Sequence, residues 1–260
     1  MKLVKCVAAA VAAAGLLAGC GTSSETPSST SATAEGGGQL MVFAAASLKQ
    51  TFTDIGEQFK TDHPGTDVEF NFAGSSDLVT QLTQGADADV FASADTKNID
   101  KAAQADLLDG DPVNFASNVL TIAVAPGNPK GITGFRDLVK PDLNVVVCAP
   151  QVPCGSVTEK VEQATGVQLA PVSEESSVTD VLNKVTTGEA DAGLVYVTDV
   201  AGAGDKVTGV NFPESADAIN TYPIATLKDS KNAELAQQFV EYVTGEAGQK
   251  VLDQAGFGKP

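Results

Sequence analysis

The sequence contains little positive charge and almost no imidazole. Among its 260 residues there is one arginine, Arg136, and one histidine, His63, and the formal net charge is −17. Nucleic acids and anionic lipid surfaces are recognised by clusters of basic side chains, and no such cluster is present. Both classes of partner are therefore excluded.

Several catalytic and ligand-binding motifs are also missing. No Gly-x-Ser-x-Gly segment occurs, and the single histidine lies in the loop-like segment Asp62-His-Pro64, so a secreted serine hydrolase is a poor alternative. The segment Gly202-Ala-Gly204 lacks the third glycine of a dinucleotide fingerprint. The acidic run Asp87–Asp95 lacks the glycine and terminal glutamate of a calcium loop, so we expect a β–α turn there and no metal site.

No hydrophobic run at the N-terminus is long enough to span a bilayer. Two lysines precede the apolar run Val7–Ala18, and the end of this run leads into the segment Leu17-Ala-Gly-Cys20. This order predicts a signal peptide over residues 1–19. The last four residues resemble a bacterial lipobox, so we expect cleavage before Cys20 and acylation of that cysteine. An ordinary signal peptide with an incidental cysteine is the alternative.

The segment after the signal is polar and has no apolar periodicity. Residues 20–38 are rich in serine and threonine and end in three glycines, which predicts a disordered tether with a reach of about 23 Å. The mature protein is then expected on the extracytoplasmic face of the cell membrane, held there by lipid. Loss of the signal changes the formal charge from −17 to −19.

Two further cysteines, Cys148 and Cys154, remain in the folded region. In an oxidising compartment such a close pair predicts a disulfide, which would contribute about 2.4 kcal/mol by closing a short loop. A metal-binding pair is the alternative, although the only histidine lies far away in the sequence.

Strand and helix signals alternate through residues 39–260. Strands are expected at Leu40–Ala46, Val68–Phe72, Val90–Ser93, Val119–Ala125, Val145–Ala149, Gly193–Val197 and Thr221–Thr226. Helical periodicity is found at Leu48–Lys60, Leu78–Leu82, Val178–Val185 and Leu235–Val243, with a short last helix that carries Val251 and Leu252. Such alternation favours mostly parallel sheets flanked by helices, which is an α/β fold.

The chain is long for one small sheet, and its site-like segments fall into two groups, 42–78 and 150–196. We therefore expect two α/β lobes with a ligand cleft between them. The first lobe would combine residues 39–120 and 224–260, and the second lobe would span 121–223.

Two segments run from a strand through small residues to a serine and then into a helix. They are Val42-Phe-Ala-Ala-Ala-Ser-Leu48 and Phe70-Asn-Phe-Ala-Gly-Ser-Ser-Asp-Leu78. Backbone N–H groups at a helix start have no intrahelical partner and lie at the positive end of the helix dipole. Paired segments of this kind predict an uncharged, donor-rich site for an oxyanion.

Serines at helix starts also have an ordinary structural use. Ser47 with Gln50, and Ser177 with Asp180, fit capping boxes. The alternative to a ligand-binding role is therefore that these serines only cap their helices.

Together these segments resemble the periplasmic molybdate-binding protein family, the substrate-binding component of an ABC importer. The resemblance covers residues 40–260, and no single motif in it is specific. Its markers are the two serine segments above, Gly85-Ala-Asp-Ala-Asp-Val-Phe-Ala-Ser-Ala-Asp95, Val152-Pro-Cys-Gly155 and Gly193-Leu-Val-Tyr196. It implies a two-lobed fold of the type II periplasmic-binding-protein kind.

The resemblance also implies a set of ligand-binding residues. Ser47 would donate from its hydroxyl and backbone N–H, and Ser75 from its hydroxyl, with Ser76 as the alternative to Ser75. Cys154 and Val178 would donate backbone N–H groups, and Tyr196 its phenolic hydroxyl. Relatives often have another small residue in place of Cys154, but a backbone donor tolerates that change.

The function implied is capture of molybdate, and of tungstate as well, for an ABC permease. No cofactor is implied beyond the bound oxyanion, and we expect a monomer attached to the membrane through lipid, such as palmitate, on Cys20. Sulfate and phosphate receptors are the rivals. Phosphate that retains a proton would need a carboxylate acceptor, and Asp77 is the candidate near the serine segments.

Overall fold

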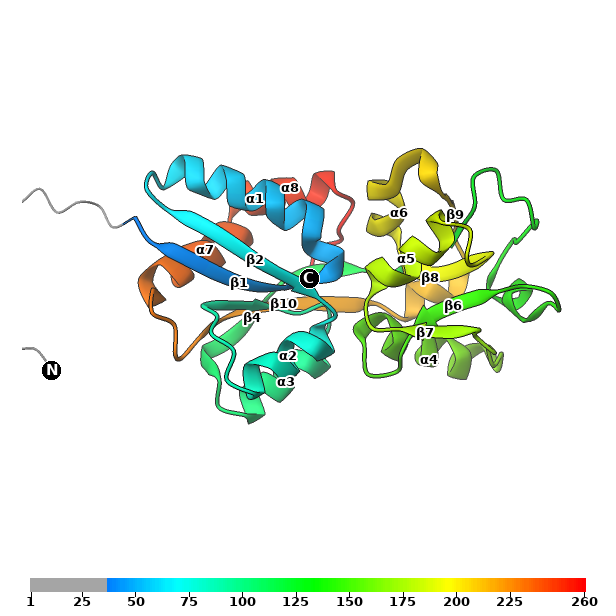
Figure 1. Cartoon of the computed structure of the whole chain (residues 1–260), viewed down its shortest axis with the longest axis horizontal. Helices are drawn as coiled ribbons and strands as arrows, with labels where there is room; N and C mark the ends of the chain where they lie inside the picture. The colour runs from blue at the N-terminus through cyan, green and yellow to red at the C-terminus, as the bar shows by residue number, and fades with distance from the viewer. Residues whose placement is uncertain (1–36) are drawn as a thin grey trace, which may run out of the picture. The chain divides into compact units, whose positions relative to one another are not determined.

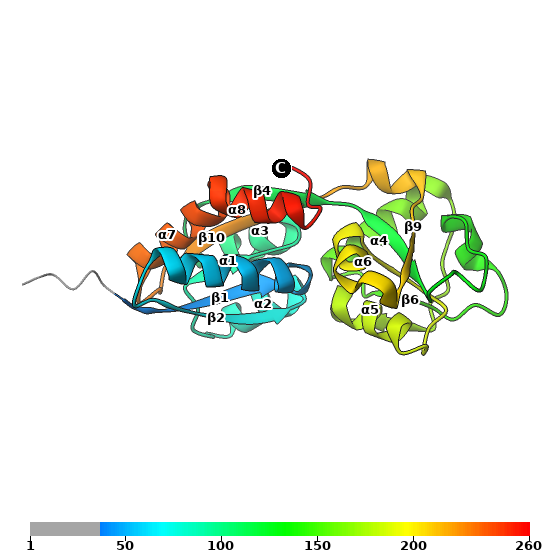
Figure 2. The same cartoon turned by 90° about the horizontal axis from the view of Figure 1, so that it is seen from above.

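Two five-stranded sheets, each flanked by helices, make up residues 37–260, which are the residues that the computed structural model describes (Figures 1 and 2). The predicted signal peptide, Cys20 and nearly all of the predicted tether lie outside the described residues. Within the described part, no helix combines the length and the apolar character that a membrane span requires.

The first lobe has the strand order β2-β1-β3-β10-β4. Its strands are β1 (Gln39–Ala45), β2 (Asp67–Ala73), β3 (Val90–Ala92), β4 (Leu108–Asn118) and β10 (Asn220–Leu227). Its helices are η1 (Ala46–Leu48), α1 (Lys49–Asp62), α2 (Ser75–Thr83), α3 (Thr96–Gln104), α7 (Ala233–Thr244) and α8 (Glu246–Gln254).

Side chains alternate between two cores across the first sheet, as the period of a strand requires. Along β1, Leu40 and Val42 pack with α1, α7 and α8, whereas Phe43 packs with α2 and α3 on the opposite face. Helix α1 contributes Phe52 and Phe59 to the first of these cores, which is the apolar face predicted from its spacing.

The second lobe has the strand order β7-β6-β8-β5-β9. Its strands are β5 (Leu120–Val124), β6 (Val145–Cys148), β7 (Ser173–Glu175), β8 (Ala192–Tyr196) and β9 (Thr208–Val210). Its helices are η2 (Phe135–Val139), α4 (Pro153–Thr165), α5 (Val178–Thr186), α6 (Val197–Ala203), η3 (Gly204–Lys206) and η4 (Pro213–Asp217).

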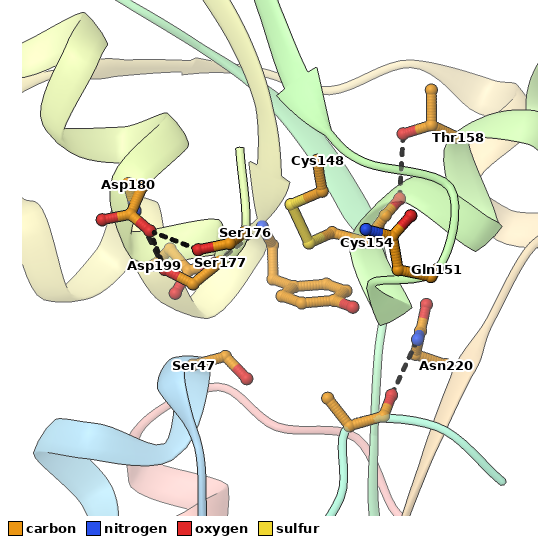
Figure 3. Close-up of a disulfide and its surroundings, with 12 residues drawn as sticks. Ser47, Cys148, Gln151, Cys154, Thr158, Ser176, Ser177, Asp180, Asp199 and Asn220 are labelled. Atoms are coloured by element: carbon orange, nitrogen blue, oxygen red, sulfur yellow. Dashed lines mark hydrogen bonds between the residues drawn. A yellow bond between two sulfur atoms is a disulfide. The ribbon is translucent and has the colours of Figure 1, made fainter. Parts of the chain in front are cut away.

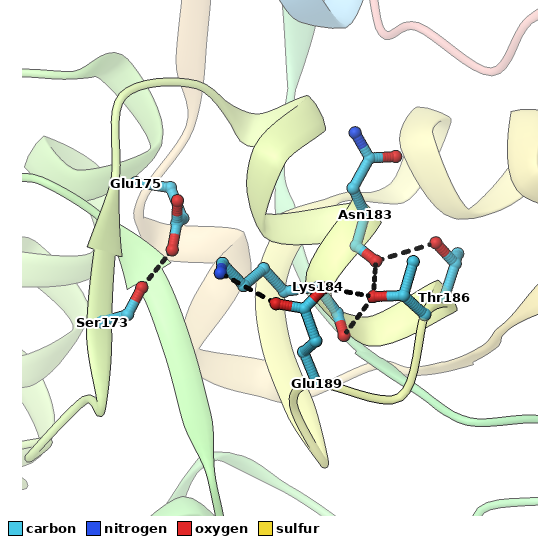
Figure 4. Close-up of polar contacts among 7 residues, drawn as sticks. Ser173, Glu175, Asn183, Lys184, Thr186 and Glu189 are labelled. Atoms are coloured by element: carbon cyan, nitrogen blue, oxygen red, sulfur yellow. Dashed lines mark hydrogen bonds and ion pairs between the residues drawn. The ribbon is translucent and has the colours of Figure 1, made fainter.

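Helix α5 shows how a helix of this lobe ends. The carbonyl oxygen of Asn183 accepts from the backbone N–H of Thr187 at 2.9 Å and from the Thr186 hydroxyl at 3.0 Å (Figure 4). Beyond the helix, Lys184 Nζ lies 3.0 Å from Glu189 Oε2. These contacts hold the turn that leads from α5 into β8.

The chain crosses between the lobes twice, at neighbouring places. One residue separates the end of β4 at Asn118 from the start of β5 at Leu120, and the return enters β10 at Asn220, whose register partner is Asn118. The return therefore joins the first sheet a few residues earlier than position 224.

Both sheets are mixed, whereas the sequence predicted mostly parallel sheets. In the first sheet β1 pairs in parallel with β2 and β3, but β10 is antiparallel to both β3 and β4. In the second sheet β6 pairs in parallel with β7 and β8, and β5 is antiparallel to β8 and β9. Every antiparallel pairing involves β5 or β10, the two strands that the chain enters directly after crossing between the lobes.

Candidate functional site

A small cavity lies between the lobes, and both lobes line it. The space is about 200 Å³ including its opening to solvent. Its lining residues are Ala45, Ala46, Ser47, Gly74, Ser75, Ala94, Val152, Pro153, Cys154, Val178 and Tyr196. All five ligand-binding residues expected from the sequence are in this set, and none of the set has a charged side chain.

The lining residues lie at the carboxyl ends of strands or in the turns and helix starts that follow them. These strands are β1, β2 and β3 in the first lobe and β6, β7 and β8 in the second lobe. Parallel strands bring their carboxyl ends to one edge of a sheet, where α/β proteins bind ligands. Each lobe therefore turns its binding edge toward the cavity.

Ser75 is the first residue of α2 and is buried. Its Oγ accepts a hydrogen bond from the backbone N–H of Ala94 at 3.0 Å. The neighbouring Ser76, which was the alternative, is also buried, and its hydroxyl has no partner among the described residues. Ser76 does not line the cavity, so Ser75 is the better candidate.

Ser47 lies within η1, one residue before Leu48, which is the N-cap of α1. It makes no side-chain cap, so the capping box predicted for Ser47 and Gln50 is wrong. A 3-10 turn comes between the strand and α1, and it moves the start of the α-helix past the serine. The hydroxyl instead lies 3.0 Å from the hydroxyl of Tyr222.

Cys154 is the second residue of α4, after Pro153 at the first position, where proline is well tolerated. Its backbone N–H is one of those without an intrahelical acceptor. A disulfide joins Cys154 to Cys148 at the end of β6, as the sequence predicted, with the Cα atoms 5.6 Å apart. Figure 3 shows this disulfide in the second lobe and Ser47 across from it in the first.

Val178 is the first residue of α5, and its side chain is part of the core of the second lobe. The preceding Ser177 is the N-cap: its Oγ accepts from the backbone N–H of Asp180 at 3.2 Å and donates to the Asp180 carboxylate at 2.7 Å (Figure 3). The predicted cap at Ser177 is thus confirmed. Because this cap does not use the Val178 N–H, that group remains available to a ligand.

Tyr196 ends β8 and lines the cavity while only 1% of its surface is exposed. Its hydroxyl has no hydrogen-bond partner among the described residues, which is costly for a buried polar group. Burial, and after it the nearby Tyr222, Asp95 and Asp199, raise the pKa of Tyr196 well above its ordinary value. The hydroxyl therefore keeps its proton and can donate it.

The backbone N–H of Tyr196 donates to the carboxylate of Asp199 at 2.8 Å. Burial raises the pKa of this carboxyl to about 7, and the hydrogen bond from Tyr196 opposes that rise. The backbone of Tyr196 is thus hydrogen-bonded to a carboxyl group that titrates near neutral pH.

Tyr222 is the residue that the sequence did not single out. It lies on β10, is fully buried, and reaches Ser47. Its strand was predicted, but no motif distinguishes this tyrosine from an ordinary core aromatic. Its partner lies 175 positions away, so no local signal could have identified the pair.

The two lobes touch beside the cavity at Gly74. A Cβ atom added there would lie 2.1 Å from the carbonyl oxygen of Ser176 in the second lobe, which is far inside van der Waals contact. At Gly202 of the second lobe an added Cβ would meet only the flexible end of Gln50 in the first lobe, at 3.0 Å. Gly74 is thus the place where the lobes approach with no room for a side chain.

Asp77, the candidate acceptor for a protonated guest, is exposed and lines an adjoining groove, not the cavity itself. Over residues 37–260 there is also no group of three or more His, Cys, Asp or Glu side chains arranged to hold a metal ion. The cavity can therefore bind a guest through neutral hydrogen-bond donors.

Comparison with known proteins gives a consistent result. Residues 40–258 match the family described as bacterial extracellular solute-binding protein. The molybdate-binding protein ModA of Mycobacterium tuberculosis is 59% identical over 251 residues, which cover 96% of this chain and 95% of that protein.

Solved structures share the fold. The sulfate-binding protein SubI of Mycobacterium tuberculosis has a TM-score of 0.76 at 19% identity, covering 84% of this chain and 86% of that one. The periplasmic molybdate-binding protein of Azotobacter vinelandii has a TM-score of 0.74 at 22% identity, covering 85% and 99%. Since the family match spans nearly all of the described residues, the chain belongs to the bacterial extracellular solute-binding proteins and is a binding protein, not an enzyme.

Proposed function

We propose that this protein captures molybdate, and tungstate as well, in the cavity between its lobes. The observation that carries the proposal is the lining: eleven uncharged residues, with hydroxyls and helix-start N–H groups contributed by both lobes. The 59% identity to a protein named for molybdate binding supports the choice of anion.

Each of the five proposed binding residues has a defined hydrogen-bond donor. Ser47, Ser75 and Tyr196 would donate from their hydroxyls, and Cys154 and Val178 from backbone N–H groups at the starts of α4 and α5. Hydrogen bonds to an ionised acceptor are about twice as strong as those between neutral groups, and helix dipoles add to them. A doubly negative guest can therefore be held without lysine or arginine.

The surface charge of the protein does not contradict this proposal. The net charge is −17, but exposed carboxylates are screened beyond about 8–10 Å, whereas the donors act at contact distance.

The remaining parts of the proposal concern location and partners. The loaded protein would dock on the membrane permease of an ABC importer. The protein would be a monomer, and acylation of Cys20 would hold it at the extracytoplasmic face of the membrane.

The lipid anchor can be tested separately. Globomycin, which blocks lipoprotein signal cleavage, should make the precursor accumulate, and Cys20→Ala should release the protein from the membrane fraction.

Sulfate is the rival ligand, because it is also a tetrahedral dianion and a sulfate-binding protein shares the fold. Hydrogen phosphate is less suited, because the cavity lining contains no carboxylate to accept its proton. Pocket size must separate molybdate from sulfate.

Calorimetry of the tether-free protein, residues 39–260, with molybdate, tungstate, sulfate and phosphate tests the proposal. We expect micromolar or tighter binding of molybdate and tungstate. Tight binding of sulfate without detectable binding of molybdate would overturn the choice of ligand. No detectable binding of any of the four anions would overturn the oxyanion-binding function.

A further inference from the structure

Ser47 and Ser75 line the cavity from the first lobe, and their hydroxyl oxygens differ in the group that is hydrogen-bonded to them. A hydroxyl has one proton to donate and lone pairs that accept. At Ser75 the backbone N–H of Ala94 donates to Oγ at 3.0 Å. A backbone N–H can only donate, so the Ser75 proton must be directed elsewhere, and the cavity is what Ser75 lines.

At Ser47 the corresponding neighbour is another hydroxyl, that of Tyr222, and distance alone allows either oxygen to be the donor. The packing of the phenol ring fixes the position of the Tyr222 oxygen, so the direction depends only on how the two O–H groups rotate about their C–O bonds. Tyr222 is fully buried, and its ring packs against Phe115, Tyr196 and Phe257 at centroid distances of 6.2, 6.1 and 5.5 Å.

The number of protons decides the direction of this hydrogen bond when an anion is bound. A fully ionised oxyanion accepts hydrogen bonds and donates none. If Ser47 donates to the guest, it cannot also donate to Tyr222, so Tyr222 must donate to Ser47. The reverse direction would leave the cavity with one donor fewer and the Tyr222 proton in need of another buried acceptor.

We propose that Tyr222 is a positioning residue that donates to Ser47 Oγ, and so commits the Ser47 proton to the cavity and selects against guests that carry a proton. This inference rests on the proposed oxyanion-binding function. It assigns a specificity role to a residue that does not line the cavity.

The environment of Tyr222 favours the donating state. Burial raises the pKa of its hydroxyl far above the ordinary value, against the opposing effect of Ser47, Asn118 and Tyr196, so the proton stays on the phenol. The Asn118 amide is itself engaged, since its Nδ2 donates to Thr198 and its Oδ1 accepts from the backbone N–H of Val119. The hydrogen bond of the Tyr222 hydroxyl is to Ser47, at 3.0 Å, so Ser47 Oγ is the acceptor that we assign to it.

The test compares two dianions near pH 8, in wild type and in Tyr222→Phe: molybdate, which carries no proton, and hydrogen phosphate, which carries one. The variant removes only a hydroxyl and keeps the packed ring. We expect molybdate affinity to fall about tenfold and phosphate affinity to hold or rise, because the Ser47 oxygen can then accept from the guest. Equal losses for both anions, or no loss, would overturn the proposal.

Tyr242→Phe is the matched control. Like Tyr222→Phe, this variant removes a hydrogen-bonded tyrosine hydroxyl. The Tyr242 hydroxyl donates to Asp62 at 2.8 Å on the outside of the first lobe. This variant should leave both affinities unchanged.

Two further measurements separate positioning through Ser47 from a general effect. In a Ser47→Ala background, Tyr222→Phe should cost no further molybdate affinity, and a second tenfold loss there would contradict the proposal. In the unliganded protein, the Tyr222 hydroxyl proton should exchange slowly in NMR spectra and faster in Ser47→Ala. Identical exchange in both proteins would also contradict it, even if wild type bound none of the anions and the proposed function had failed.

Discussion

The two lobes contribute different kinds of donor to the same cavity. In the first lobe, Ser47 and Ser75 present side-chain hydroxyls, each of which is held by a second group, Tyr222 or Ala94. In the second lobe, Cys154 and Val178 present backbone N–H groups at helix starts, and Tyr196 is the one hydroxyl that this lobe adds to the cavity lining. The first half of the site should therefore depend on side-chain identity, and the second on backbone position.

The largest effect should come from the point where the lobes touch. Gly74→Ala would place a methyl group 2.1 Å from the Ser176 carbonyl oxygen, so the lobes could not approach as they do here. We expect molybdate affinity to fall about a hundredfold, near the upper end of overpacking costs of 1–3 kcal/mol. Calorimetry measures the loss, and small-angle X-ray scattering should show a more extended liganded state.

Gly202→Ala is the control for this prediction, because its added methyl meets only the end of the Gln50 side chain. It should bind as wild type does. Equal affinities in Gly74→Ala and wild type would mean that contact between the lobes does not contribute to binding.

The next effect concerns the hydroxyls of the first lobe. Ser47→Ala or Ser75→Ala should each weaken molybdate binding by about 1.5–3 kcal/mol, the range for a hydrogen bond to a charged group. Ser76→Ala removes an adjacent buried hydroxyl that does not line the cavity, so it should bind normally. A loss at Ser76 comparable to that at Ser75 would reverse their assignment.

For the second lobe the expected effect is on stability more than on binding. Replacing both Cys148 and Cys154 by serine opens the disulfide but keeps the backbone N–H at position 154. We expect the free energy of unfolding to fall by about 2.4 kcal/mol in urea titrations, with only a few-fold change in affinity. A loss of affinity as large as that of Ser75→Ala would show that the disulfide positions the donor.

The smallest effect should be a pH dependence that arises at Asp199. Its pKa of about 7 in the folded protein lies above the value of about 3.9 for an exposed Asp, so the folded state retains a proton that the unfolded state loses. Its contribution to stability is therefore greatest at low pH and is lost as the pH rises from about 4 to 7.

The same group should influence binding, because an ionised Asp199 beside Tyr196 repels a dianion. Molybdate affinity should fall a few-fold between pH 6 and pH 8, and Asp199→Asn should flatten this slope in calorimetric titrations. An unchanged slope in the variant would mean that another group causes it.

Much of the fold was predictable because its signals are local. The apolar spacing of α1 and the serine, glycine and valine pattern around α5 marked those helices correctly. Strand β4 was not predicted, since Gly110 and Pro112 interrupt its pattern and much of it is exposed. That strand is held by its pairing with β10, more than a hundred residues later.

The sequence by itself indicated where many strands end and helices begin, because those signals depend on neighbours a few positions apart. From them, and from a family resemblance, came the five proposed donor residues, all of which line one cavity. Only the tertiary structure decided that the Ser47 hydroxyl meets Tyr222 instead of capping α1, and that Gly74 touches the opposite lobe. Those contacts join segments far apart in the chain, and only the packing of β10 and of the two lobes brings them together.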